Sequence, residues 1–236
     1  MLSEEISSFE KGEVLFFDKP LYWTSFDLVN KIRNILRHNL GLKNIKVGHA
    51  GTLDPLADGL MIVCTGKATK RIDEFRDLDK EYIAEIHFGA ATPSYDLETA
   101  INATFPVEQI SEQLVLQTLE NFLGEQDQVP PIHSAKLIGG KRAYEFARKG
   151  IEKELKPVKV YFRELELLSF GIPETRVRIL CSKGTYIRSF ARDLGSALGS
   201  GAYLSSLRRS GIGPYSLGNA LTLEKFEKII MEMKQN

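Results

Sequence analysis

The chain is poor in cysteine and has no long apolar run, and each shortage excludes a class of protein. Its two cysteines, Cys64 and Cys181, lie far apart, each in or beside an apolar run. Buried free thiols in a reducing compartment are therefore expected, not a disulfide or a zinc site. No apolar run approaches the ~20 residues that a membrane span needs. The first ten residues are mixed and acidic, unlike a signal peptide, so we expect a cytoplasmic protein.

An excess of charge of one sign is also missing, because 31 Lys and Arg residues balance 31 Asp and Glu residues. The charges are unevenly distributed along the chain. Residues 73–128 hold 13 acidic residues against 2 basic ones, whereas residues 133–209 hold 16 basic residues against 7 acidic ones. This asymmetry suits a protein with one basic face that binds nucleic acid, but two solvated surfaces of different charge explain it equally well.

Signatures of cofactor and metal chemistry are absent as well. The Gly66-Lys67 pair fails as a phosphate-binding loop, because Met61 stands where such a loop needs glycine and Ala68 where it needs Ser or Thr. The chain also lacks a His-Glu-x-x-His motif, paired-cysteine motifs and a dinucleotide-binding fingerprint. The sequence therefore predicts no cofactor and no metal.

What the chain does have is a stiff, glycine-rich loop, Val47–Gly59, which presents a carboxylate. Its three glycines permit positive φ or close backbone approach, and Pro55 pushes Asp54 toward an extended conformation. The apolar run Leu60–Cys64 that follows predicts a buried strand. Considered by composition alone, a tight surface turn with a solvated Asp54 is the simpler interpretation.

Hydrophobic periodicity predicts strands and helices on both sides of this loop. We expect helices capped by Thr24 or Ser25 and by Thr185 or Ser189, and we expect Phe26 on the buried face of the first. Strands are expected at 13–17, 60–64, 80–89, 157–170, 175–181 and 207–213, and helices at about 25–38, 69–78, 108–123, 142–148, 185–195 and 223–233. This order predicts an α/β (α+β) fold with a mixed, largely antiparallel sheet flanked by helices, in a single domain. The acidic stretch at about 96–123 is a possible packed insertion.

Several segments, in the same order, resemble the TruB family of tRNA pseudouridine synthases. The loop reads Gly48-His49-Ala50-Gly51-Thr52-Leu53-Asp54-Pro55-Leu56-Ala57, and the other matching segments are Asp18-Lys19-Pro20, Gly66-Lys67-Ala68-Thr69-Lys70, Ser134-Ala135, Lys183-Gly184-Thr185-Tyr186-Ile187-Arg188, Asp193-Leu194-Gly195 and Leu207-Arg208-Arg209. The resemblance covers about residues 13–215 and implies the pseudouridine synthase fold. Residues 91–96 depart from the commoner family pattern, although Asp96 still aligns with a family Asp.

The resemblance implies isomerisation of the T-loop uridine at position 55 of tRNA to pseudouridine. Asp54 would be the catalytic nucleophile, a role that a carboxylate can fill, and Arg188 would pair with it. Tyr82 would stack on the base and help to remove the proton from C5. Tyr186 would line the pocket, and Leu207 would close it.

A base inside folded RNA must be extruded before it can react, and His49 is a candidate wedge or stacking partner for the displaced nucleotide. The candidate phosphate contacts are Lys19, Lys70, Lys136, Arg142, Arg148, Lys183, Arg208 and Arg209. On composition alone, Lys19 and Arg188 would be ordinary surface cations. Because the chain stops soon after Leu207-Arg208-Arg209, we expect no separate C-terminal RNA-binding domain of the PUA type. Recognition would then come from the T-arm of the tRNA. We also expect a monomer.

Two other classes of function remain open. An RNA-binding module or folding chaperone would share the basic stretch and the aromatic residues without needing Asp54. A hydrolase could use Asp54 with His49 and Asp58, with or without a metal. Release of the C5 hydrogen of uridine separates the three, because only a synthase must release it.

Overall fold

The computed structural model describes residues 2–134, 136–147, 149, 151, 153 and 155–235. The chain divides into two compact units: a terminal unit, Met1–Glu81 with Arg208–Asn236, and a central unit, Tyr82–Leu207. Strands β4 (Lys80–Phe88) and β12 (Ala202–Ile212) contribute residues to both units. Within the described part, no helix is long and apolar enough to cross a membrane. A single catalytic domain with an insertion at about 96–123 stays a prediction.

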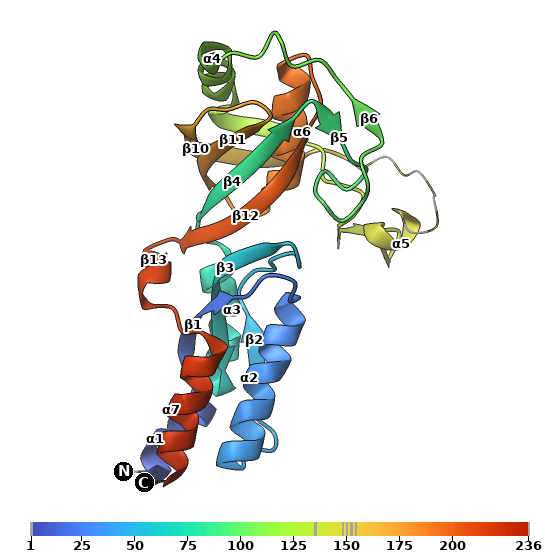
Figure 1. Ribbon diagram of the computed structural model, residues 1–236. Coiled ribbons are helices and arrows are strands. Elements are labelled where there is room, and N and C mark those ends of the chain that lie inside the picture. Colours follow the sequence, from blue (N-terminus) through green and yellow to red (C-terminus); the bar gives the residue numbers. More distant parts are fainter. Residues whose placement is uncertain are drawn as a thin grey trace. The chain divides into compact units, whose positions relative to one another are not determined.

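The sheet of the terminal unit is built around β3 (Ala57–Thr65), which is buried along almost its whole length (Figure 1). Strand β3 pairs antiparallel with β1 (Val14–Lys19) and with β2 (Val47–His49). It is also hydrogen-bonded to β12, which pairs in turn with β13 (Tyr215–Ser216). The buried strand predicted at Leu60–Cys64 is therefore confirmed, and β1 runs two residues past its predicted end at Phe17.

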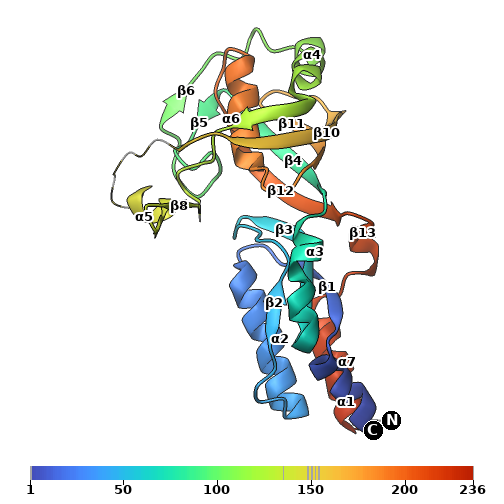
Figure 2. The ribbon, with the colours of Figure 1, turned by 180° about the vertical axis from the view of Figure 1, so that it is seen from behind.

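Four helices belong to the terminal unit: α1 (Leu2–Lys11), α2 (Ser25–Leu40), α3 (Ile72–Arg76) and α7 (Leu223–Gln235). Helix α1, which was not predicted, lies beside α7 in both views, and Phe9 packs edge to face on Phe226 (Figures 1 and 2). Two short 3₁₀ helices, Gly66–Arg71 and Leu217–Asn219, complete the unit. The single helix predicted at 69–78 is thus a 3₁₀ turn followed by the short α3.

Helix α2 begins as predicted and buries Val29, Ile32, Ile35 and Leu36, but not Phe26. Thr24 and Asp27 form a capping box, and Gly41 ends the helix in the left-handed conformation. Phe26, predicted for the buried face, is instead 64% exposed. Ser25 takes the inward position because its hydroxyl bonds to the loop residue Leu53. The next residue is rotated by ~100° about the helix axis, which carries Phe26 outward.

The sheet of the central unit follows the order β12-β4-β11-β10-β7. Strand β10 (Val158–Ser169) pairs antiparallel with β11 (Glu174–Cys181) and with β7 (Gly124–Gln128). Tyr82, Ala84, Ile86 and Phe88 of β4 alternate inward along the strand predicted at 80–89. The unit also holds α4 (Glu112–Phe122), α5 (Ala143–Ala147), α6 (Ile187–Ala197) and two short hairpins, Ala90–Ala91 with Ala103–Thr104 and Leu137–Ile138 with Lys141–Arg142.

Two helices of this unit differ from their predicted starts. Helix α4 begins at Glu112 and not at Glu108, because Ser111 caps it. Helix α6 is capped by neither Thr185 nor Ser189. The Thr185 hydroxyl donates to the Ser182 carbonyl, and the Ser189 hydroxyl donates to the Val129 carbonyl.

Both cysteines are buried free thiols, as expected from the sequence. Cys64 lies on β3 and Cys181 ends β11. Burial raises the pKa of the Cys64 thiol to about 11, so this group is protonated and unreactive at neutral pH.

Candidate active site

The loop that carries Asp54 is held on both sides of the carboxylate residue. The Ser25 hydroxyl accepts from the Leu53 amide at 2.8 Å and donates to the Leu53 carbonyl at 3.0 Å. On the other side, the Tyr22 amide donates to the Pro55 carbonyl at 2.7 Å. Helix α2 and the turn before it thus fix the neighbours of Asp54, while its own side chain stays partly exposed. Such a rigid presentation suits a group that must meet a reacting atom.

Arg209 holds the preceding part of the same loop from beneath. Its guanidinium donates to the carbonyls of Gly51 at 3.2 Å, Thr52 at 3.4 Å and Leu60 at 2.7 Å. The side chain is 1% exposed, although it was a candidate phosphate contact. Gly59 permits this packing, because a Cβ atom there would lie 2.3 Å from the Arg209 carbonyl oxygen. A buried fork of five donors can satisfy several carbonyls at once, and Arg209 therefore shapes the loop.

Lys19 is also buried, so the surface position expected for it is wrong. Its ammonium donates to the carbonyls of Pro20 at 2.9 Å and Trp23 at 2.6 Å. Burial lowers the pKa of Lys19 to about 8, an effect that the negative charges of Asp58 and Asp54 partly offset. Lys19 thus braces the turn before α2 and sets a positive charge within the field of Asp54. Its burial gives no support to a direct contact with RNA phosphate.

Arg208 remains partly exposed and bridges two carboxylates of the terminal unit. It pairs with Asp18 at 2.7 Å and also with Asp58. The carboxylate of Asp58 is therefore already engaged by a guanidinium. This arrangement weakens the hydrolase interpretation, in which Asp58 would serve beside Asp54. Within the described residues, no group of three or more His, Cys, Asp or Glu is placed to hold a metal ion.

His49 ends β2, just before the loop, and is half-buried. Burial lowers the pKa of His49, and the backbone of Gly51 offsets this only in part. The ring is therefore neutral at physiological pH. A neutral ring can stack on a nucleobase without desolvating a charge, which fits the predicted role.

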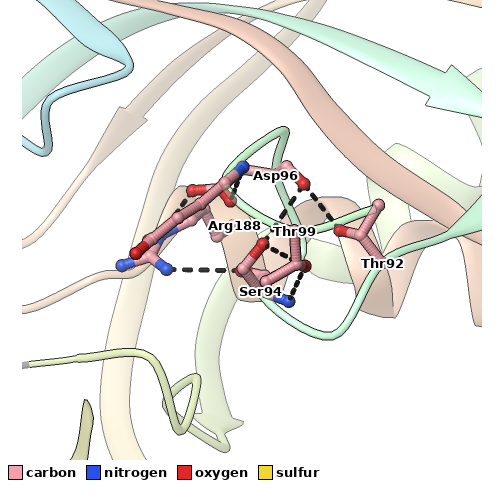
Figure 3. A network of polar contacts seen from close by, with 6 residues as sticks. Thr92, Ser94, Asp96, Thr99 and Arg188 are labelled. Atoms are coloured by element: carbon pink, nitrogen blue, oxygen red, sulfur yellow. Dashed lines mark hydrogen bonds and ion pairs between the residues drawn. The ribbon is translucent and has the colours of Figure 1, made fainter. Parts of the chain in front are cut away.

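In the central unit, Arg188 is buried against Asp96 (Figure 3). Arg188 Nε lies 3.5 Å from Asp96 Oδ2, and its Nη1 donates to the Ser94 carbonyl at 3.3 Å. The hydroxyls of Thr92 and Ser94 both donate to the Asp96 carbonyl, and Thr99 bonds to the hydroxyl of Ser94. The surface position that composition alone suggested for Arg188 is therefore wrong. Sequence reasoning noted Asp96 as an aligned residue but gave it no role.

The remaining predicted residues are distributed over both units. Tyr82 is buried on β4, whereas Tyr186 and Leu207 are partly exposed and Lys183 is exposed, all in the central unit. Lys70 is exposed in the terminal unit, and Arg148 lies outside the described residues. Asp54 and Arg188 belong to different units, so their pairing stays a prediction.

The supporting roles of Ser25, Gln128 and Arg209 were not predicted from the sequence. Gln128 is buried at the end of β7 and bonds to the backbone of Tyr186. Each residue makes contacts with backbone groups far away in the sequence, and hydrophobic periodicity carries no signal for such contacts.

Comparison with known proteins accounts for nearly the whole chain. Residues 37–187 match the N-terminal domain of TruB family pseudouridylate synthases, and residues 188–236 match the tRNA pseudouridylate synthase B C-terminal domain. A protein of Phocaeicola vulgatus named tRNA pseudouridine synthase B is 56% identical over 219 residues, which cover 93% of each chain. The protein of the same name from Parabacteroides distasonis is 55% identical over 222 residues, which cover 94% of each chain.

Solved structures share the fold. A chain in the structure of an H/ACA RNP bound to a substrate RNA containing 2'-deoxyuridine matches with a TM-score of 0.70 and 26% identity. A chain of a Cbf5-Nop10-Gar1 complex matches with a TM-score of 0.72 and 26% identity. Each match covers 99% of this chain but only 57% and 61% of the solved chains, respectively. The family domains and the identity to relatives over more than nine-tenths of their length together show that this chain belongs to the TruB family of pseudouridylate synthases.

Proposed function

We propose that this chain converts the T-loop uridine at position 55 of tRNA to pseudouridine, with Asp54 as the nucleophile. The chain is a pseudouridylate synthase by family and hence an isomerase. The matched relatives are named tRNA pseudouridine synthase B, which supports tRNA as the substrate. The position in the tRNA and the role of Asp54 are our inferences from the resemblance and the site.

The observation that supports Asp54 most directly is the way its loop is held. Ser25 binds Leu53, Tyr22 binds Pro55, and Arg209 binds Gly51 and Thr52. All of these bonds involve the loop backbone, so the chain that carries the carboxylate is fixed on both sides of Asp54. Pre-organisation of this kind lowers the cost of aligning a catalytic group with its target.

The reaction rearranges one bond without changing the composition of the nucleoside. The N1–C1' bond of uridine breaks, the uracil rotates, and a C5–C1' bond forms, while C5 loses a proton and N1 gains one. The Asp54 carboxylate can attack either C1' of the sugar or C6 of the base, and both routes yield a covalent intermediate. Both routes use the carboxylate as the attacking group, and the positive charge of the Lys19 ammonium interacts with the negative charge of Asp54.

The other predicted residues fill complementary roles in this proposal. Arg188 orients Asp54, Tyr82 stacks on the uracil and helps to remove the C5 proton, Tyr186 lines the pocket and Leu207 closes it. His49 stacks where the target nucleotide leaves the loop of the RNA. Of the candidate phosphate contacts, Lys70, Lys136, Arg142, Lys183 and Arg208 are exposed or partly exposed, and we propose that they contact RNA phosphates.

The decisive assay follows the release of tritium from C5 of labelled uridine in a tRNA transcript. Wild-type protein is expected to release it over many turnovers. Asp54→Asn should abolish release and leave RNA binding within about 1 kcal/mol, because a nucleophile acts mainly in the transition state.

Asp58→Asn is the matched control, since it removes a carboxylate from the same loop region that also faces Lys19. This variant should retain turnover, although Arg208 loses a partner. Multiple turnovers by Asp54→Asn would refute the nucleophile role. Tight RNA binding by wild-type protein without tritium release would favour an RNA-binding module instead.

A further inference from the structure

Helix α6, which carries Arg188, begins without a capping side chain of its own. Tyr186 is its N-cap residue and makes no side-chain cap. The first amides of a helix lack partners within the helix, so an uncapped start usually frays. At this start, the backbone of the N-cap residue Tyr186 is hydrogen-bonded by a residue 58 positions earlier in the chain.

Gln128 supplies both of these bonds with one side chain. Its Oε1 accepts from the Tyr186 amide at 2.8 Å, and its Nε2 donates to the Tyr186 carbonyl at 3.0 Å. That carbonyl also accepts the first bond of α6, from the amide of Phe190 at 3.1 Å. The Gln128 side chain is only 3% exposed, which limits the competition of water for both bonds. Gln128 thus fixes the residue two positions before Arg188.

The backbone of Gln128 sits at a second junction. Gln128 is the last residue of β7 and lies opposite Val158, the first residue of β10. The basic segment between them, residues 129–157, therefore leaves and returns to the sheet at this one pair. Helix α6 also binds the first residue of the segment, because the carbonyl of Val129 accepts from Ser189 at 2.8 Å and from Arg192 at 3.3 Å.

We infer that Gln128 is a positioning residue for the proposed reaction, which holds Tyr186 and Arg188 in place and ties them to the base of the basic segment. This inference rests on the proposed function, since it assumes that Arg188 and Tyr186 serve the reaction. Gln128 acts through these two residues and contacts neither sugar nor base. Its loss should therefore affect the chemical step more than the binding of RNA.

The first test replaces Gln128 by Met, which keeps the length of the side chain and removes both hydrogen bonds. A displacement of about 1 Å in a catalytic group can lower a rate on the order of a hundredfold, so we expect a loss of about 10- to 100-fold in the single-turnover rate at saturating tRNA. The Kd for tRNA should stay within about threefold. Hydrogen exchange at the Tyr186 amide, measured without RNA, should accelerate by about tenfold or more.

The second test uses Gln128→Glu, whose effect should depend on pH. As a carboxylate, the new side chain can still accept from the Tyr186 amide but repels the Tyr186 carbonyl. Once protonated, it donates to that carbonyl and restores both bonds. Burial raises the pKa of such a carboxyl group above the ordinary ~4.3 of Glu. The single-turnover rate of Gln128→Glu should therefore approach the wild-type rate as the pH falls from about 8 to about 5.

Gln126→Glu is the matched control on the same strand. Gln126 donates to the Asn121 carbonyl at 3.2 Å and makes no contact with α6 among the described bonds. The charged groups that line the cavity of about 220 Å³ beside Gln128 are Asp127, Arg192 and Asp193, and Asp127 also pairs with Lys159. Their titration affects wild type, Gln126→Glu and Gln128→Glu alike. The ratio of the Gln128→Glu rate to the Gln126→Glu rate at each pH therefore reports the effect of residue 128 alone.

The inference is overturned if Gln128→Met keeps its single-turnover rate within twofold of wild type. It is also overturned if Gln128→Glu follows the same pH profile as Gln126→Glu, a comparison that remains decisive if Gln128→Met fails to fold. Failure of the proposed function has a different signature, because wild type itself would then release no tritium. In that case faster exchange at the Tyr186 amide in Gln128→Met would still show that Gln128 holds Tyr186. A role of Gln128 in this reaction would be rejected.

Discussion

Arg188 Nε lies 3.5 Å from Asp96 Oδ2, and less than a tenth of either side chain is exposed. Asp96 is itself fixed, because its other carboxylate oxygen accepts from the Glu98 amide at 2.9 Å. The Thr92 hydroxyl holds the Asp96 carbonyl at 2.7 Å. Asp96 therefore defines one side of the guanidinium and leaves the orientation of Arg188 little freedom within the central unit.

Removing Asp96 should cost both stability and activity. Asp96→Ala is expected to lower the free energy of unfolding by about 3 kcal/mol, because it deletes one partner of a buried ion pair. Asp193→Ala is the control, since its pair with Arg192 is partly exposed and should cost at most about 1 kcal/mol. Urea denaturation of both variants checks this, and equal losses would contradict the structural role of Asp96.

Gly59 should tolerate no side chain. Its φ is +108°, and an added Cβ would lie 2.3 Å from the carbonyl oxygen and 2.8 Å from the amide nitrogen of Arg209. Gly59→Ala should therefore destabilise the protein by more than about 3 kcal/mol and displace Arg209 from the Asp54 loop. Gly41→Ala measures the cost of a positive φ alone, because Gly41 has a φ of +70° and open space where a Cβ atom would lie. This variant should lose only ~1 kcal/mol of stability. Thermal unfolding of the two variants gives the comparison.

Lys19 should make stability depend on pH in the alkaline range. Its pKa is about 8 in the folded state and near 10.5 when the chain is unfolded. Between these values the unfolded state binds the extra proton, so folding is favoured increasingly as the pH rises. Relative to Lys19→Met, wild-type protein should gain up to about 3 kcal/mol between pH 8 and 10.5, at ~1.4 kcal/mol per pKa unit. Urea titrations at several pH values test this, and a constant difference would contradict the buried ammonium.

Tyr22 offers a stabilising substitution. Its φ is +65°, a conformation that costs an L-residue about 1–2 kcal/mol, and its side chain is 75% exposed. Tyr22→Gly should therefore stabilise the protein by about 0.5–1 kcal/mol, after part of the gain is offset by the entropy of the unfolded chain. Tyr22→Ala keeps the Cβ atom and should give no such gain. Differential scanning calorimetry distinguishes the two variants.

Features that depend on neighbouring residues were predictable from the sequence. The buried run Leu60–Cys64, the alternation along β4 and the cap at Thr24 all follow from short-range patterns, and the structure contains all three. The family resemblance added the candidate residues, of which Asp54 stands on the predicted non-helical loop. Errors arose where a distant partner outcompeted the local preference. Phe26 is exposed because Ser25 bonds to Leu53, and Ser189 does not cap α6 because it bonds to Val129.

The sequence by itself therefore determined the main buried strands, the start of α2, the family to which the chain belongs, and the stiff loop around Asp54. Only the tertiary structure decided how the candidate cations are used. Lys19 and Arg209 look like surface charges in the sequence, yet the fold buries both against backbone carbonyls, and Arg188 is buried with Asp96. The physical reason is that burial and hydrogen-bond partners are properties of the packed chain. A charged side chain has no local pattern that reveals whether water or a distant carbonyl will satisfy it.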